Sequence, residues 1–223
     1  MKDEILNSWE VNAKEWIHTI DNEGILSRKV TNEAIINTVL KYNPESVCDV
    51  GCGEGWLTRK LIKKGIDTTG IDGTEALIKS AQVKNIGEFK YLTYEEIIKN
   101  NGLGNQSFEA ILFNFSLYQK EATEQLFLVI QNSLKEKSLI FIQTLHSFNL
   151  IQGDFAYQNQ WIENAWKDLQ GNFKQPHSWY FRTVSGWLSL FKRVNLEVLE
   201  VQEPLFPDSL KPASLIFVLT PKK

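Results

Sequence analysis

The sequence predicts a single α/β domain built around a mostly parallel β-sheet. Its 223 residues, of which 43% are hydrophobic, suit one domain with one core. Between residues 46 and 145, short apolar segments alternate with segments that repeat apolar residues at helical spacing. Strands that alternate with helices of about ten residues indicate a parallel sheet with right-handed crossovers.

Two helices are expected before the sheet begins. The first carries Trp9, Ala13 and Trp16 at helical spacing, and the second covers residues 30–41. Asn43-Pro44 ends the second helix, because the residue before a proline avoids the helical conformation. We expect residues 1–42 to form a helical cap on the domain.

The central part of the chain, residues 43–147, is expected to bind a cofactor. Gly65 is the C-terminal stop of its first helix. The expected strands cover residues 46–50, 67–71, 89–92, 110–115 and 139–145, and the expected helices cover residues 54–64, 75–83 and 121–134.

The alternation breaks between residues 146 and 182. This stretch is rich in aromatic residues and has little periodicity. We expect residues 148–182 to form an insertion over the functional edge of the sheet, too short to build its own core. Residues 183–223 then close the domain with a helix over 184–193 and two strands, 196–203 and 214–220. A proline-rich connection between these strands suits an antiparallel hairpin.

A glycine-rich turn follows the first expected strand. Residues 49–55 read DVGCGEG, and Asp72 ends the next strand, 21 residues after Gly51. Ligands of open α/β sheets bind outside the carboxyl ends of the strands, and glycines let the backbone approach them closely. An acid at the position of Asp72 can accept both ribose hydroxyls of a nucleoside. The alternative is a tight turn without a ligand, which does not need three spaced glycines.

The turn favours a nucleoside without phosphates. A dinucleotide fingerprint requires a small residue where this chain has Trp56. Asp49 would repel a pyrophosphate but suits an ammonium group. S-adenosylmethionine joins an adenosine to an ammonium, a carboxylate and a sulfonium, and it carries no phosphate. We therefore expect it as the cofactor, with S-adenosylhomocysteine as the product.

Three segments resemble the class I S-adenosylmethionine-dependent methyltransferases: residues 47–55 (VCDVGCGEG), 70–73 (GIDG) and 108–115 (FEAILFNF). The resemblance covers residues 43–147 and the closing helix and strand pair in residues 183–223. Within the family, the chain is similar to small-molecule enzymes of the ubiquinone-biosynthesis type. It implies a Rossmann-like sheet of seven mostly parallel strands in the order 3-2-1-4-5-7-6, with the last strand antiparallel and helices on both faces. It also implies methyl transfer to an oxygen or nitrogen atom of a small-molecule acceptor.

The resemblance assigns cofactor contacts residue by residue. Asp49 would face the ammonium, and Asp72 would hold the ribose hydroxyls. The other contacts fall on Gly51, Cys52 and Gly53 along the methionine part, on Gly73, Thr93 and Tyr94 at the adenine, and on Asn114 and Phe115 between cofactor and acceptor. Thr93-Tyr94 departs from the Asp-Ala pair that is common in the family, which leaves the adenine partner open. Residues 135–138 depart from its usual Gly-Gly turn.

The residues before the sheet add three candidates to this site. Trp9 and Trp16 could close over the cofactor as a lid, and Arg28 could pair with its carboxylate through two hydrogen bonds. The alternative for the two tryptophans is plain packing on the domain surface.

The candidates for the chemistry follow the fifth expected strand. Methyl transfer depends on alignment and on the exclusion of water, and an oxygen or nitrogen nucleophile can also need a base. His146 is the first candidate for this base and His177 the second, with a structural hydrogen bond as the alternative for each. Tyr180 and Arg182 belong to an aromatic run that either walls an apolar acceptor or covers the sheet edge. No zinc-binding spacing is present, so no metal is expected.

Other functions compete with this interpretation. The net charge of −3 gives no general attraction to nucleic acid, and residues 114–118 (NFSLY) contain none of the prolines with which nucleic-acid amino methyltransferases grip a flipped base. Trp56 disfavours a nicotinamide-dependent dehydrogenase. A protein acceptor, a cofactor-binding protein without turnover and the oligomeric state stay open. The charged first residues, the two cysteines and the lack of a long apolar run predict a cytoplasmic protein without a membrane span.

Overall fold

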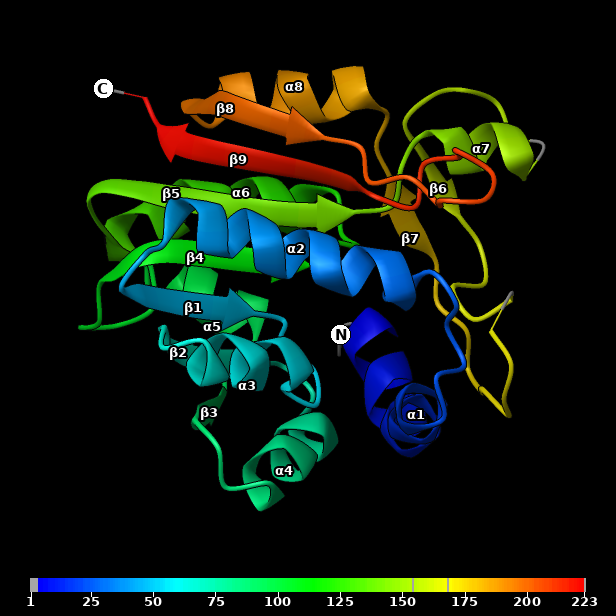
Figure 1. Ribbon diagram of the computed structural model, residues 1–223, viewed down its shortest axis with the longest axis horizontal. Helices are drawn as coiled ribbons and strands as arrows, with labels where there is room; N and C mark the ends of the chain where they lie inside the picture. Colours follow the sequence, from blue (N-terminus) through cyan, green and yellow to red (C-terminus); the bar gives the residue numbers. More distant parts are fainter. Residues whose placement is uncertain (1–3, 154, 168, 223) are drawn as a thin grey trace.

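The computed structural model describes residues 4–153, 155–167 and 169–222, and a seven-stranded sheet forms its centre (Figure 1). The strands lie in the order β3-β2-β1-β4-β5-β9-β8. Strands β1 to β5 pair in parallel, whereas β9 is antiparallel to both β5 and β8. The expected order is confirmed, with β8 and β9 as the sixth and seventh strands. The strands are β1 (Ser46–Val50), β2 (Asp67–Asp72), β3 (Glu88–Tyr91), β4 (Phe108–Asn114), β5 (Leu134–Thr144), β8 (Leu196–Gln202) and β9 (Leu215–Pro221).

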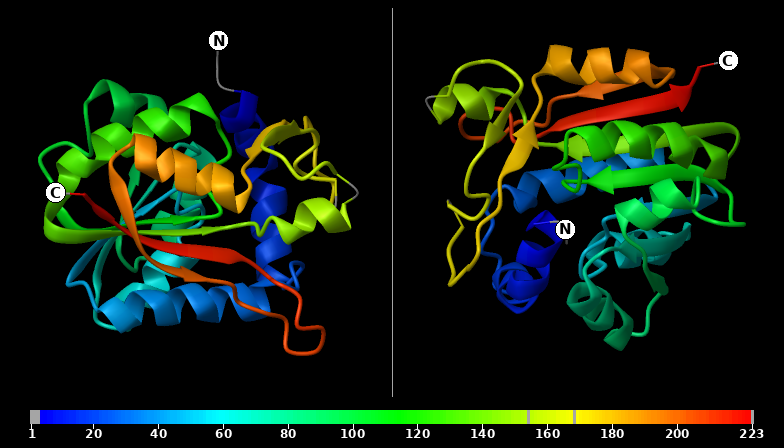
Figure 2. Two further views of the ribbon diagram at one scale, coloured as in Figure 1. Left: turned by 90° about the horizontal axis from the view of Figure 1, so that it is seen from above. Right: turned by 180° about the vertical axis from the view of Figure 1, so that it is seen from behind.

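Helices cover both faces of this sheet (Figure 2). One face packs against α2 and α3, and the other packs against α5, α6 and α8. In β4, Ala110 and Leu112 face the first layer whereas Ile111 and Phe113 face the second, because successive side chains of a strand point to opposite faces. The helices are α1 (Glu4–Asp21), α2 (Arg28–Tyr42), α3 (Trp56–Lys63), α4 (Glu75–Val83), α5 (Tyr94–Lys99), α6 (Glu121–Ile130) and α8 (Val184–Arg193).

Some boundaries differ from the sequence prediction. The helix expected over 121–134 ends at Ile130 in a short 3-10 turn, and β5 begins at Leu134 instead of residue 139. The extra strand residues 135–137 are charged and exposed, so they carry no apolar signal. Lys137 takes a positive φ of 61°, and this irregularity occupies the place of the family's Gly-Gly turn. Helix α5 was not predicted because it has only six residues.

Two segments outside the parallel sheet lie at the edge formed by the carboxyl ends of its strands. Helix α1 lies beside the carboxyl ends of the parallel strands, and the insertion passes the same edge (Figures 1 and 2). The insertion contains α7 (Phe148–Gln152) and a small antiparallel sheet of β6 (Gln160–Ile162) and β7 (Trp179–Phe181), where no regular structure was expected. No helix in the described part of the chain combines the length and apolarity that a bilayer crossing needs.

Candidate active site

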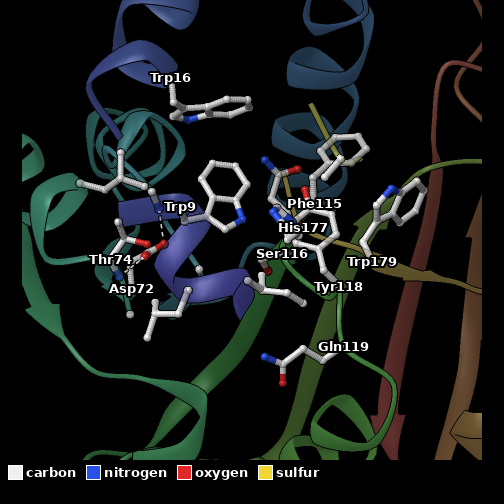
Figure 3. Close-up of a pocket in the computed structure, with 18 of the residues that line it drawn as sticks. Trp9, Trp16, Asp72, Thr74, Phe115, Ser116, Tyr118, Gln119, His177 and Trp179 are labelled. Carbon is white, nitrogen blue, oxygen red and sulfur yellow. Dashed lines mark hydrogen bonds between the residues drawn. The ribbon is translucent and has the colours of Figure 1, made fainter. Parts of the chain in front are cut away.

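A cavity of about 1190 Å³ opens at the carboxyl edge of the sheet (Figure 3). Its walls come from α1, from the loops after β1, β2 and β4, and from the insertion. Figure 3 shows Asp72 and Thr74 on one side of the cavity, Tyr118, His177 and Trp179 on the other, and Trp9 between them. Pockets for one drug-sized ligand hold roughly 300 to 1,000 Å³, so the cavity has room for a cofactor and an acceptor together.

The glycine turn presents bare backbone to this cavity. Gly51 and Gly53 have φ values of 78° and 58°, in the left-handed region that favours glycine. A Cβ on Gly51 would lie 2.4 Å from Cβ of Ser116, whereas a Cβ on Gly53 would meet no atom within 4 Å. The backbone amides of Gly51 and Cys52 both donate to the carbonyl of Ile71, at 2.8 and 3.0 Å, which fastens the turn to β2. All three turn residues, 51 to 53, line the cavity.

Asp72 lies in the cavity wall at the end of β2. Its Oδ2 accepts the amide of Gly53 at 2.9 Å, and its Oδ1 accepts the amide of Thr74 at 2.7 Å. Burial raises the pKa of Asp72, and the hydrogen bonds from the amides of Gly53 and Thr74 and from the hydroxyl of Thr74 oppose the rise. A carboxylate can accept about four hydrogen bonds, so Asp72 keeps capacity for a ligand hydroxyl.

Asp49 and Asn114 bring unsatisfied acceptors to the cavity wall. Oδ2 of Asp49 accepts the hydroxyl of Thr58 at 2.7 Å, while its Oδ1 is buried and has no hydrogen-bond partner among the described residues. The same holds for Oδ1 of Asn114 at the end of β4. Burial raises the pKa of Asp49 to about 7. Buried acceptors without a partner are rare in folded proteins, so these oxygens fit a ligand that supplies N–H or O–H donors.

Arg28 supplies a cation on the same side. It is the first residue of α2, it lines the cavity, and its guanidinium lies 4.7 Å from the centre of the Trp56 ring. Burial lowers the pKa of Arg28, and the charge of Glu54 opposes this shift. Within the described part of the chain, Arg28 forms no ion pair. A ligand carboxylate matches this position.

The loop after β3 differs in part from the expected adenine contact. Thr93 caps α5: its hydroxyl accepts the amide of Glu96 at 3.2 Å and donates to Oε2 of Glu96 at 2.8 Å. That hydroxyl makes both hydrogen bonds of the helix cap while Thr93 lines the cavity, so its contact with the adenine stays a prediction. Tyr94 still suits the expected contact with the adenine, because its amide is in the first turn of α5 and has no acceptor within the helix. Gly73 lies against Leu6 of α1, which a Cβ would approach to 3.1 Å.

Aromatic side chains line the half of the cavity that faces the insertion. They come from α1, from the loop after β4 and from the insertion, and they are Trp9, Trp16, Phe115, Tyr118, Trp166, His177, Trp179 and Phe181. Trp9 and Trp16 thus line the cavity instead of packing on the outer surface. Tyr118 was not predicted, although its position four residues after the last residue of β4 could have indicated it. Phe115 has a φ of 51°, a strained value for a non-glycine residue.

His146 lies outside the cavity wall, contrary to its predicted role as the base. Its Nε2 is 2.7 Å from Oε1 of Glu203, and its Nδ1 accepts the amide of Phe148 at 3.0 Å. Both ring nitrogens thus have structural partners, and a base must reach the proton that it removes. Of the two candidate histidines, His177 lines the cavity and His146 does not.

Tyr180 and Arg182 also lie behind the cavity instead of in its wall. Arg182 donates from Nη2 to the carbonyls of Gln119 and Lys120, at 3.0 and 2.9 Å. Its guanidinium lies 4.9 Å from the ring centres of both Tyr180 and Trp187. Arg182 therefore anchors the loop after β4, and neither residue is placed to contact an acceptor.

Replacement of His146 by alanine is expected to leave the affinity for S-adenosylhomocysteine and the rate of methyl transfer within about twofold of wild type. Loss of the contacts to Glu203 and Phe148 should cost about 1 kcal/mol of stability, which lowers Tm by about 2 to 4 °C in a chain of this size. Calorimetry and a methyl-transfer assay measure the three quantities. A large loss of rate with unchanged cofactor affinity would restore His146 as the base.

Comparison with known proteins agrees with this geometry. A family model described as a methyltransferase domain matches residues 26–201. No curated protein in the comparison matches the sequence. Among solved structures, a S-adenosylmethionine-dependent methyltransferase from Clostridium acetobutylicum aligns at 14% identity with a TM-score of 0.65, over 92% of this chain and 96% of that chain.

Two further solved structures contain the demethylated cofactor. The 1,6-didemethyltoxoflavin-N1-methyltransferase of Burkholderia thailandensis, with bound 1,6-didemethyltoxoflavin and S-adenosylhomocysteine, aligns at 14% identity and a TM-score of 0.70, over 99% of this chain and 88% of that chain. The plantazolicin methyltransferase BpumL in complex with SAH aligns at 17% identity and a TM-score of 0.65, over 99% and 96%. These likenesses show the fold, and the family match covers most of the chain. The chain therefore belongs to the methyltransferase-domain family and has the Rossmann-like fold of the class I S-adenosylmethionine-dependent methyltransferases.

Proposed function

We propose that this protein transfers a methyl group from S-adenosylmethionine to an oxygen or nitrogen atom of a small-molecule acceptor. The observation that carries the proposal is that the cavity is continuous: a half lined by the glycine turn and charged groups continues into a half lined by aromatic rings. The first half, which we call the donor half, suits a zwitterionic nucleoside. The second, the acceptor half, suits an apolar acceptor beside it.

The donor half offers a partner for each polar part of S-adenosylmethionine. Asp72 accepts the ribose hydroxyls, the unpaired oxygen of Asp49 faces the ammonium, and Arg28 meets the carboxylate. Gly53 leaves open space in which the methionine part lies along the backbone. Bound S-adenosylmethionine supplies a methyl group that its sulfonium already activates.

The protein's own residues then align the acceptor, exclude water and take up a proton. Trp9, Phe115 and Tyr118 wall the acceptor half and keep it dry, which favours a displacement between aligned groups. Of the two candidate histidines, His177 is the one in this wall, with its ring 5.2 Å from that of Trp166, and we assign the base to it; both of its ring nitrogens are buried, so the ring has to turn toward the acceptor to take up a proton. His177 takes up the proton when the nucleophilic oxygen or nitrogen of the methyl acceptor carries one.

Methyl-labelled S-adenosylmethionine tests the reaction class. Wild-type protein is incubated with a filtered metabolite extract, with protein and with nucleic acid in separate reactions, and S-adenosylhomocysteine and labelled product are measured in each. Label in the filtered extract supports the proposal. Label confined to the protein or nucleic-acid reaction contradicts a small-molecule acceptor. Binding of S-adenosylhomocysteine without label in any reaction indicates a cofactor-binding protein without turnover.

The affinity for S-adenosylhomocysteine is expected to rise roughly tenfold between about pH 5.5 and about pH 7.5. Burial raises the pKa of Asp49 to about 7, so its carboxylate ionises in this interval and then attracts the ligand ammonium. The stability of the unbound protein should change in the opposite direction over pH. A raised pKa means that the folded state binds the proton more tightly than the unfolded state, so stability falls as pH rises from about 4 to about 7.

The variant Asp49→Asn provides the control, since its amide has nearly the same shape and no titration. In this variant, the affinity for S-adenosylhomocysteine and the stability of the unbound protein should both depend less on pH. Calorimetry measures the first and thermal unfolding the second, across the same interval. An unchanged rise of affinity in Asp49→Asn would assign the titration to another group.

A further inference from the structure

Trp9 is the residue on which the aromatic rings of the acceptor half converge. Its ring meets Trp16 and Trp166 edge to face, with ring centres 5.0 and 4.7 Å away and interplanar angles of 80° and 77°. It faces Tyr118 almost in parallel, at 6.2 Å and 20°. The family match begins at residue 26, so α1 and its tryptophans precede the matched residues.

Hydrogen bonds hold α1 and the insertion together around these rings. Nε1 of Trp166 donates to the hydroxyl of Ser8 at 2.9 Å, and that hydroxyl donates to the carbonyl of Gln175 at 2.6 Å. The side chain of Asn12 exchanges two hydrogen bonds with the backbone of Lys174, at 2.6 and 2.7 Å. Ring orientations are therefore set before a ligand binds, which lowers the entropy cost of binding.

The polar groups of this half do not match a charged acceptor. Among the described residues of the insertion that line it, the charged side chains are Glu163 and Lys167, and both are exposed. Arg182, the buried cation of this region, is committed to backbone carbonyls behind the wall. A buried ion without a partner costs several kcal/mol. The hydroxyl of Tyr118 has no hydrogen-bond partner in the described part of the chain and offers one polar contact to an uncharged ligand.

We propose that the acceptor is an uncharged molecule with a planar aromatic ring system, and that Trp9 is the residue that selects it by aromatic contact. This inference rests on the proposed function, because it describes the acceptor of that reaction. Trp9 and Tyr118 are stacked on each other, so an acceptor ring does not enter between them and instead contacts the parts of the two rings that line the cavity. Such contacts favour a planar aromatic ring over a saturated ring of equal size, since each adds about 0.5 to 1.5 kcal/mol beyond the buried area. Two such contacts correspond to a preference of about tenfold.

Four probes with the same fused bicyclic ring system, each substituted at position 2, test the inference by calorimetry at saturating S-adenosylhomocysteine. They are 2-naphthol, the saturated decahydro-2-naphthol, the anion 2-naphthoate and the cation naphthalen-2-ylmethylammonium. We expect 2-naphthol to bind about tenfold more tightly than its saturated counterpart and more tightly than either ion. Equal binding of the saturated probe, tighter binding of an ion, or no binding of 2-naphthol up to its solubility limit overturns the inference.

Variants of Trp9 then identify the selecting residue. Trp9→Leu should reduce the tenfold preference to about threefold or less, whereas Trp9→Phe keeps an aromatic face and should retain most of it. The matched control is Trp161→Leu, because Trp161 is a tryptophan of the insertion that is 49% exposed and outside the cavity wall. An unchanged preference in Trp9→Leu overturns the role of Trp9. If S-adenosylhomocysteine itself fails to bind wild-type protein, the proposed function fails instead, so the two failures are separable.

Discussion

Replacement of Asp72 by alanine is expected to weaken the binding of S-adenosylhomocysteine by about 100-fold, which corresponds to about 2.8 kcal/mol. Asp72 lines the cavity at the end of β2 and keeps hydrogen-bonding capacity for the ribose. A hydrogen bond to a charged group contributes about 1.5 to 3 kcal/mol, and the variant loses the ribose contact. It also loses the acceptor for the amides of Gly53 and Thr74. Calorimetry with S-adenosylhomocysteine measures the change.

Asp67→Ala is the matched control for this substitution. Asp67 is the exposed first residue of the same strand, at the end opposite to the cavity, so the affinity in this variant should equal that of wild type. Thermal unfolding of each variant separates loss of binding from loss of structure. A folded Asp72→Ala protein with wild-type affinity would contradict both the ribose contact and the cofactor half of the site.

The donor half of the site was predictable because its residues are close in sequence to the elements that place them. Gly51 and Gly53 follow β1 directly, and Asp72 ends the adjacent strand. Parallel strands bring their carboxyl ends to one edge, so the strand pattern alone places these groups together. The same local logic is ambiguous at Thr93, where a capping residue and a ligand contact have the same sequence position.

The acceptor half was less predictable because its side chains are oriented by distant partners. His146 follows β5 as predicted, but Glu203, which lies 57 residues later, holds its ring away from the cavity. Arg182 is held by carbonyls more than 60 residues earlier in the chain. Trp9 was a candidate on helical spacing alone, and its place beside Tyr118 depends on how α1 docks. Contacts of this range leave no periodic signal in the sequence.

Replacement of Gly51 by alanine is expected to destabilise the protein by about 2 to 5 kcal/mol, the sum of a strained backbone and an overpacked contact. The new Cβ would lie 2.4 Å from Cβ of Ser116, and the φ of 78° is unfavourable for any residue with a Cβ. Ser116 cannot move away easily, because its hydroxyl donates to the carbonyl of Val50 at 2.9 Å. Chemical or thermal unfolding of the variant measures the loss.

Gly53→Ala is the informative partner of this variant, because it separates a cofactor site from a tight turn without a ligand. Its φ of 58° costs an alanine only about 1 to 2 kcal/mol, and its Cβ would meet no protein atom within 4 Å. The added methyl group instead enters the space assigned to the methionine part of the cofactor. The variant should therefore be more stable than Gly51→Ala and yet bind S-adenosylhomocysteine at least about tenfold more weakly than wild type. If the turn only connects β1 to α3, Gly53→Ala loses the strain energy alone and its affinity stays at the wild-type value, since no ligand occupies the space that the methyl group fills.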